Sequence, residues 1–83
     1  MSTVTDTEVL QALSGNIARL MGVKNISQRK LSAITGEPLM TINSVVNGRH
    51  MPGAGLVHRV AEALGVAVET LYEAANKKTS RRA

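Results

Sequence analysis

Residues 26–48 have the sequence ISQRKLSAITGEPLMTINSVVNG, and this stretch decides the fold. Ser27 is a residue type that caps helix N-termini, and Gly36 supplies the permissive backbone that a helix C-terminus needs. Pro38 suits the first turn of a second helix, because its missing N–H has no partner there. The apolar stripe of that second helix consists of Ile42, Val45 and Val46. With a stop at Asn47-Gly48, the pattern predicts two short helices joined by a tight turn.

The segment before this pair has the pattern of a longer helix. Thr5 and Glu8 have the spacing of a capping box, which marks a helix N-terminus. Apolar residues then recur at intervals of three and four, at Val9, Leu10, Leu13, Ile17, Leu20 and Met21. Gly22 to Asn25 is predicted to be the break that ends this helix. Two helices as short as the following pair are not stable alone, so they need the rest of the chain.

The remaining sequence also predicts helices, and no strand pattern or internal repeat is present. After the first helix, the expected helices cover residues 27–35, 38–46, 56–64 and 68–75, with a loop at 48–55. The fold class is therefore predicted to be all-α, with five helices. We expect one domain over residues 1–76 and a basic flexible tail over residues 77–83.

The helix pair resembles the helix-turn-helix of the phage Cro/CI-type repressors, the Xre-like family. The residues in register with the family pattern are Ile26, Ser27, Gln28, Leu31, Ser32, Gly36, Thr41, Ile42, Asn47 and Gly48. Residues 60–66, VAEALGV, followed by Glu69, Thr70 and Leu71, match the family's fourth helix and the start of its fifth. The resemblance implies a compact lambda-repressor-like domain that places its second motif helix in the DNA major groove.

Composition narrows the class of protein. The 83 residues carry a formal charge of +4, which suits a polyanionic partner, and contain no cysteine and one aromatic residue, Tyr72. Without cysteine there is no disulfide framework and no thiolate metal site. The two histidines, His50 and His58, form no metal cluster or catalytic triad with their neighbours in the sequence. We therefore expect no enzyme, no metal and no cofactor.

The N-terminus has no signal-peptide pattern, and no window has the length of a transmembrane helix. We therefore expect a cytoplasmic protein, and the resemblance implies action on the nucleoid of a bacterial host cell. Part of the positive charge lies in the tail, at Lys77, Lys78, Arg81 and Arg82. That tail is interpreted either as a solvated end or as an arm that contacts DNA.

The outward face of the second motif helix is expected to contact base edges. By register, the base-contacting candidates are Leu39, Met40, Asn43 and Ser44. Asn43 can pair bidentately with adenine, and Ser44 can reach a base or a phosphate. Leu39 and Met40 depart from the family, which often has Gln, Ser or Arg there, and they can only pack, for example against a thymine methyl. The alternative is that one of them folds back onto the core.

The ends of the same motif are expected to contact phosphates. The resemblance implies this role for Gln28, Thr41, Asn47, Arg49 and His50. A helix N-terminus offers free N–H groups to an anion at Gln28, and Arg49 is a strong phosphate donor. His50 adds charge only when it is protonated. The alternatives are an ordinary exposed first-turn residue at Gln28 and a solvated loop at residues 47–50.

The resemblance implies a sequence-specific, double-stranded DNA-binding transcriptional regulator, usually a repressor, that binds a two-half-site operator as a homodimer. The expected dimer interface consists of Val68, Leu71 and Tyr72, with closure of the monomer core as the alternative for Leu71 and Tyr72. A second hypothesis is a protein-interaction module on the same fold, such as an antitoxin or the partner of an antirepressor. A third is nonspecific nucleic-acid binding through the basic tail.

Overall fold

A computed structural model describes residues 4–73 of the chain, and this part is helical without strands. Its helices are α1 (Asp6–Lys24), α2 (Gln28–Thr35), α3 (Leu39–Val46), α4 (Ala54–Leu64) and α5 (Val68–Leu71). The prediction of an all-α fold with five helices is confirmed over this range. The predicted basic tail, residues 77–83, lies outside the described residues, as do residues 74–76.

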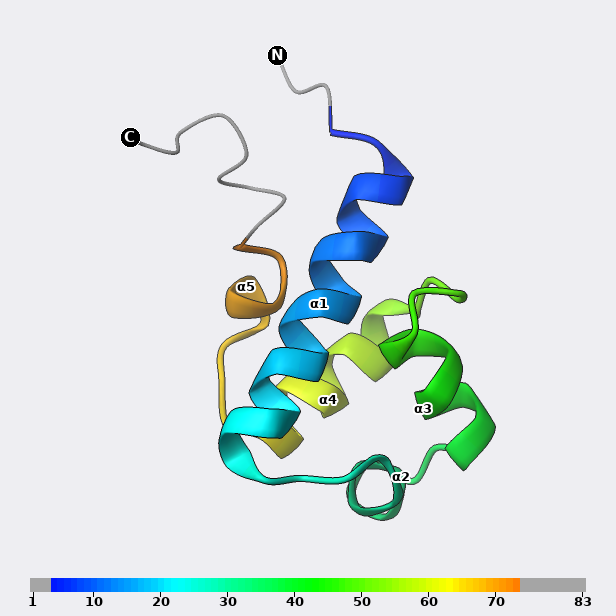
Figure 1. Ribbon diagram of the computed structural model, residues 1–83, viewed down its shortest axis with the longest axis vertical. Coiled ribbons are helices and arrows are strands. Elements are labelled where there is room, and N and C mark those ends of the chain that lie inside the picture. The colour runs from blue at the N-terminus through cyan, green and yellow to red at the C-terminus, as the bar shows by residue number, and fades with distance from the viewer. Residues whose placement is uncertain (1–3, 74–83) are drawn as a thin grey trace.

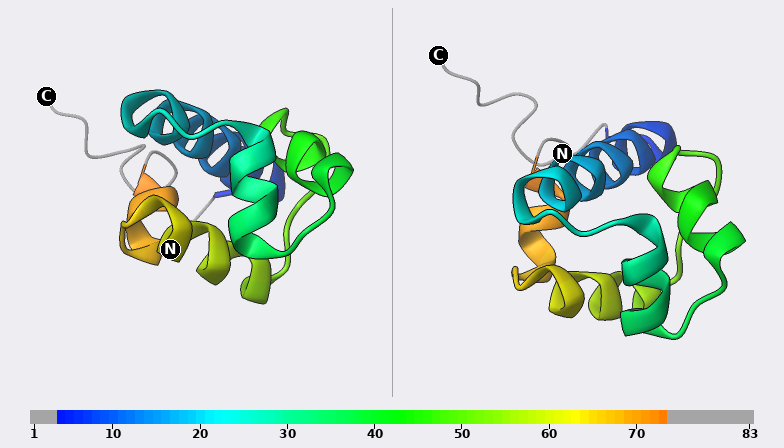
Figure 2. Two further views of the ribbon diagram at one scale, coloured as in Figure 1. Left: turned by 90° about the horizontal axis from the view of Figure 1, so that it is seen from below. Right: turned by 60° about the horizontal axis from the view of Figure 1, so that its bottom comes forward.

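The helices pack around α1, the longest of them. Helix α1 contacts α3, α4 and α5, and α2 contacts α3 and α4. Figures 1 and 2 show α3 and α5 on opposite sides of α1. The shared core is aliphatic and consists of Leu13, Ile17, Leu20, Met21, Leu31, Ile42, Val45, Leu56, Val57, Val60, Ala61, Leu64 and Leu71. The helix-turn-helix pair therefore stands on a core that the other helices help to build.

The predicted helix starts are confirmed at α1 and α2. The Thr5 hydroxyl accepts a hydrogen bond from the Glu8 backbone N–H at 3.2 Å, and the Thr5 N–H donates to the Glu8 carboxylate at 3.0 Å. These two bonds form the capping box. The Ser27 hydroxyl accepts from the Lys30 N–H at 3.0 Å, so Ser27 caps α2. Pro38 precedes α3 as its N-cap and is not its first helical residue.

The predicted break at Gly22–Asn25 is wrong in detail, because α1 continues through Gly22 to Lys24. A single glycine inside a helix costs only about 1 kcal/mol, which the packing of a long helix outweighs. The residue that ends α1 is Asn25, which adopts a left-handed conformation with φ 58°. Asparagine tolerates this conformation better than other residues with a side chain.

Two further boundaries differ from the prediction. Helix α4 begins at Ala54, two residues before the predicted start at Leu56, because Gly53 and not the apolar pattern marks its N-cap. Helix α5 ends at Leu71, although the pattern predicted a helix to residue 75. Ala74 and Ala75 lie outside the described residues. Periodicity locates the buried face of a helix, whereas hydrogen bonds at its ends set its length.

Helix α5 is attached to α1 through Leu71. The Leu71 side chain is 0% exposed, and its backbone carbonyl accepts a 2.8 Å hydrogen bond from the buried Asn16 side-chain nitrogen of α1. Leu71 therefore closes the monomer core, which was the alternative to its predicted place in a dimer interface. Because its side chain is fully buried, the prediction that Leu71 contacts a partner copy is wrong. Val68 and Tyr72 pack against the core but keep part of their surface exposed.

We predict that Asn16→Ala lowers the free energy of unfolding by about 1–3 kcal/mol, because it leaves the buried Leu71 carbonyl without its donor. Gln11→Ala is the matched control, since Gln11 is an exposed residue of the same helix. Urea denaturation of the full chain measures both variants. Equal stability of the two variants would show that the Asn16 bond does not hold α5 in place.

Candidate nucleic-acid interface

Three features fix the conformation of the turn between α2 and α3. Gly36 ends α2 with φ 78°, a left-handed conformation that favours glycine. The Thr35 hydroxyl donates to the Leu31 carbonyl at 2.8 Å and accepts from the Glu37 N–H at 3.3 Å. The Glu37 carboxylate pairs with Arg59 of α4. These contacts fix the direction in which α3 leaves the turn, so the orientation of its outer face is set by the fold.

Helix α3 has one buried face and one solvent face. Ile42 and Val45 are 1% and 2% exposed, whereas Leu39 is 40% exposed and Met40 is 82% exposed. Neither Leu39 nor Met40 folds back onto the core, so that alternative does not describe this fold. Asn43 and Ser44 lie between these extremes and remain partly exposed. The predicted base-contacting residues therefore share the outward side of α3.

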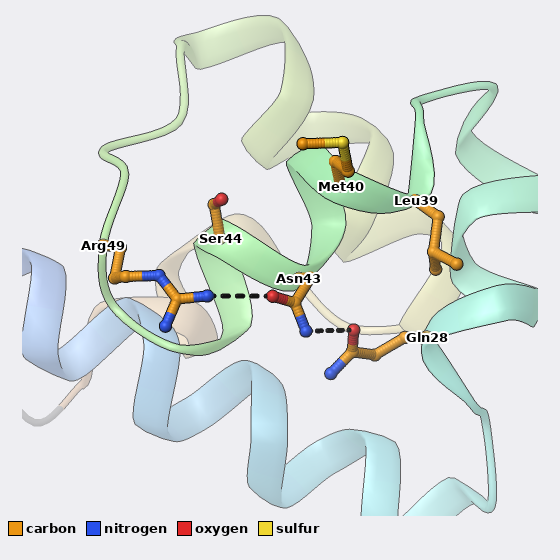
Figure 3. A pocket seen from close by; sticks show the side chains of 6 residues that line it. All are labelled: Gln28, Leu39, Met40, Asn43, Ser44 and Arg49. Atoms are coloured by element: carbon orange, nitrogen blue, oxygen red, sulfur yellow. Dashed lines mark hydrogen bonds between the residues drawn. The ribbon is translucent and has the colours of Figure 1, made fainter.

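A row of hydrogen-bonded side chains crosses this outward side. The Arg49 Nη2 donates to Asn43 Oδ1 at 2.9 Å, and Asn43 Nδ2 donates to Gln28 Oε1 at 3.1 Å. Figure 3 shows Arg49 at one end, Asn43 in the middle and Gln28 at the other end. The sequence placed these residues in separate roles and did not predict their contact. The row joins the start of α2, the middle of α3 and the loop that follows α3.

The position of Arg49 follows from how α3 ends. The Gly48 N–H donates to the Val45 carbonyl at 3.1 Å, and the Arg49 N–H donates to the Ser44 carbonyl at 2.8 Å. This pair of bonds is a Schellman motif, which reverses the chain after a helix. Gly48 has φ 72°, and a Cβ at this position would lie 3.2 Å from the Ser14 Oγ of α1. The Asn-Gly stop thus returns Arg49 to the face of α3, and the close approach to α1 leaves little room for a side chain at residue 48.

The same face carries two shallow concavities that are open to solvent. One open concavity is lined by Gln28, Leu39, Met40, Asn43, Ser44 and Arg49. A neighbouring one is lined by Met40, Thr41, Ser44, Arg49 and His50. Asn47 is exposed, and its side-chain nitrogen donates to the Asn43 carbonyl at 2.9 Å. Eight of the nine residues predicted to contact bases or phosphates therefore line this surface. The ninth, Asn47, is hydrogen-bonded to α3.

The charge of this region is positive. Between residues 24 and 50 the basic side chains are Lys24, Arg29, Lys30 and Arg49, and the acidic one is Glu37. All four basic residues are exposed, and the Glu37 charge is compensated by Arg59. The first turn of α2 carries no acidic residue, so the positive end of its helix dipole is not neutralised within that turn. The segment that contains the two motif helices therefore has a net positive charge, which attracts a polyanion.

Residues 4–73 contain neither a candidate metal site nor a membrane-spanning helix. In this range the structure holds no cluster of three or more histidine and acidic side chains that could bind a metal ion. In the same range no helix combines the length and the apolar character needed to span a membrane. The hollowed face of α3 is thus the candidate site that the described residues present most clearly.

The fold and this surface define a helix-turn-helix protein whose second motif helix presents an open outer face. A family model described as "HTH_3: Helix-turn-helix" matches residues 17–71, and the chain belongs to this family, which is of the Cro/CI or Xre-like type. The family is one of DNA-binding transcription regulators, and its partner is double-stranded DNA. No curated protein and no solved structure matched the chain.

The exposure of α3 predicts that its two faces respond differently to substitution. We expect Met40→Ser to change the free energy of unfolding by no more than about 0.5 kcal/mol, because the side chain is already in solvent. We expect Ile42→Ala to lower it by about 2–5 kcal/mol, because it opens a cavity in the core. Urea denaturation compares the two variants. A large loss of stability in Met40→Ser would mean that Met40 packs in the core after all.

Proposed function

We propose that this protein is a sequence-specific repressor of the phage Cro/CI type that binds a two-half-site operator as a homodimer. The family supports regulation through DNA. The observation that carries the finer proposal is the outer face of α3, where polar and apolar side chains of different bonding capacity are exposed side by side. A nonspecific binder needs only positive charge, whereas direct readout needs donors, acceptors and apolar groups at fixed positions. The proposed place of action is the nucleoid in the cytoplasm of a bacterial host.

We assign the four exposed or partly exposed side chains of α3 to base edges. Asn43 offers both a donor and an acceptor, which suits adenine, and Ser44 offers a hydroxyl. Leu39 and Met40 offer apolar contact with a thymine methyl group. The phosphate contacts are assigned to Gln28, Thr41, Asn47, Arg49 and His50. Gln28 precedes the base-contacting set in the sequence, Thr41 lies within it, and the other three follow it. Contacts of this second kind position the protein without reading sequence.

A second candidate function is a protein-interaction module, such as an antitoxin or the partner of an antirepressor. The observation in its favour is the exposure of apolar residues on and beside the motif: Ile34 at 49%, Leu39 at 40% and Met40 at 82%. Exposed apolar groups are common at interfaces between proteins. The charged Arg49 side chain lines the same face and suits a phosphate backbone better than an apolar protein surface, which favours DNA.

The test of the function is selection of preferred duplexes from random DNA by the full chain and by four variants. Asn43→Ala and Ser44→Ala should each relax the preference at particular positions by about 1–3 kcal/mol per lost base contact. Leu39→Ala and Met40→Ala should act chiefly at a position that contains thymine. Identical preferred sites for the wild type and all four variants would show that this face does not read bases.

The proposed dimer follows from the size of the domain and the position of α5. One recognition helix contacts only a few base pairs, which is too few for useful specificity in a genome. Two copies with recognition helices about 34 Å apart fit successive major grooves on one side of the duplex. Val68 and Tyr72 are the proposed contacts, because they lie at α5, on the side of α1 opposite α3 (Figure 1). Pairing there leaves both recognition helices free.

We predict that two protomers bind one palindromic operator, and that the free protein is largely monomeric because two partly buried side chains provide a small interface. Tyr72→Ala should weaken binding to the palindrome more than binding to a single half-site. Sedimentation with and without the operator gives the stoichiometry. One protomer per operator, at saturation and with full affinity, would rule out the dimer.

A further inference from the structure

We propose that Arg49 is a positioning residue that sets the direction of the Asn43 and Gln28 carboxamides, and that base preference at the position read by Asn43 therefore depends on Arg49. The proposal rests on the proposed DNA-reading function and deepens it. In the simpler assignment, Arg49 only contacts a phosphate. The structure adds a second role, because one of its guanidinium nitrogens is bonded to the centre of the reading face.

The donor-to-acceptor direction of the hydrogen bonds in this row follows from the chemistry of Arg49. A guanidinium group has five N–H donors and no acceptor, and it stays charged at every ordinary pH. The atom of Asn43 that faces Arg49 must therefore be the acceptor, Oδ1, as the 2.9 Å bond shows. Rotating the carboxamide by half a turn would bring Nδ2 against the guanidinium, donor against donor. Arg49 thus selects one of two carboxamide orientations that are otherwise nearly equal in shape.

The orientation of the Asn43 carboxamide in turn fixes the orientation of the Gln28 carboxamide. With its oxygen toward Arg49, Asn43 presents Nδ2 on the other side, where it donates to Gln28 Oε1 at 3.1 Å. The Gln28 oxygen is thereby committed to Asn43, and the dashed line in Figure 3 ends on that oxygen, so the Gln28 amide nitrogen takes no part in this bond. An amide nitrogen at the N-terminus of α2 that is not used within the row remains a donor for an anion such as phosphate. The row is therefore directional from the cation to the proposed phosphate contact.

The orientation of Asn43 decides which base it can recognise. After its two bonds within the row, the carboxamide keeps one N–H and one oxygen lone pair for a partner. Adenine needs this pair of groups, with a donor to N7 and an acceptor for the N6 amino group, in one spatial order. A carboxamide free to rotate presents both orders and discriminates less. Removing Arg49 should therefore change selectivity, and not only affinity.

The fold holds Arg49 in the place that this role requires. Its backbone N–H is bonded to the Ser44 carbonyl at 2.8 Å, so its Cα stays beside the last turn of α3. The preceding Gly48 has φ 72°, and a Cβ there would lie 3.2 Å from the Ser14 Oγ, so both the backbone and the space favour glycine at this position. Only one of the guanidinium donors is used by Asn43, so the others remain available to a phosphate. Positioning and phosphate contact are thus compatible in one side chain.

The first experiment tests the row in the free protein, without DNA. Arg49→Gln removes the charge and introduces a group that can donate or accept, whereas Arg49→Lys keeps a charged group that can only donate. We expect Arg49→Gln to shift the side-chain amide signals of Asn43 and Gln28 in a ¹⁵N-resolved NMR spectrum. Arg29→Gln, which removes an equal charge from the exposed first turn of α2, should leave the Asn43 signals in place. Unchanged Asn43 and Gln28 signals in Arg49→Gln would overturn the proposal.

The second experiment measures base discrimination, after thermal melting has shown that each variant is folded. The position read by Asn43 is the one where Asn43→Ala loses its preference. At that position Arg49→Gln should reduce the ratio of affinities for the preferred and altered base pair about tenfold, while Arg49→Lys and Arg29→Gln retain it. In an Asn43→Ala background, Arg49→Gln should have no further effect on this ratio. In both the wild-type and the Asn43→Ala background, Arg49→Gln should lower the salt slope of DNA binding by about one.

The outcomes separate the roles of Arg49. An unchanged ratio at every position, with only a lower salt slope, would reduce Arg49 to a phosphate contact and overturn the proposal. Loss of preference at a different position would make Arg49 a base reader and would equally overturn it. Absence of any selected sequence for the wild type would overturn the proposed function and the effect of Arg49 on readout together. An unchanged amide spectrum alone would overturn the role of Arg49 and leave the function standing.

Discussion

Burial of three aliphatic side chains from the two motif helices is the constraint on which the rest of the structure depends. Leu31, Ile42 and Val45 are each at most 2% exposed, and they lie in the core that α1 and α4 help to build. Helices of eight residues gain too little from their own hydrogen bonds to persist in water, so this packing is what keeps them folded. Because the inner face of α3 is committed to the core, its outer face is left for a partner.

The outer face works as a unit because the fold brings its parts together from separate segments. Gln28 begins α2, Asn43 lies in α3, and Arg49 follows the helix stop, yet the three form one hydrogen-bonded row. Each end of the row is placed by a backbone feature: the Ser27 cap before Gln28 and the left-handed turn at Gly48 before Arg49. Local backbone geometry therefore has a direct chemical consequence at the proposed DNA surface, namely the direction in which a carboxamide points.

Predictions from the sequence were most accurate where one local interaction dominates. The capping box at Thr5, the cap at Ser27 and the glycine turn at Gly36 involve residues at most four positions apart, so their spacing alone identifies them. Predictions were less accurate where local signals compete with packing. Gly22 looked like a helix end, but α1 continues past it because the packing of the long helix outweighs the cost of one glycine, and Asn25 ends it three residues later. The N-cap of α4 at Gly53 and the C-cap of α5 at Tyr72 were likewise missed, because the apolar pattern does not mark these caps.

The sequence by itself determined the helix pair, the buried stripe of α3 and the family, because periodicity, caps and turns are encoded by neighbouring residues. It also located the candidate DNA surface on Leu39, Met40, Asn43 and Ser44. Only the tertiary structure decided that Leu39 and Met40 are exposed, that Leu71 belongs to the core, and that Arg49 bonds to Asn43. The physical reason is that exposure and side-chain pairing depend on how distant segments pack, which no local pattern records.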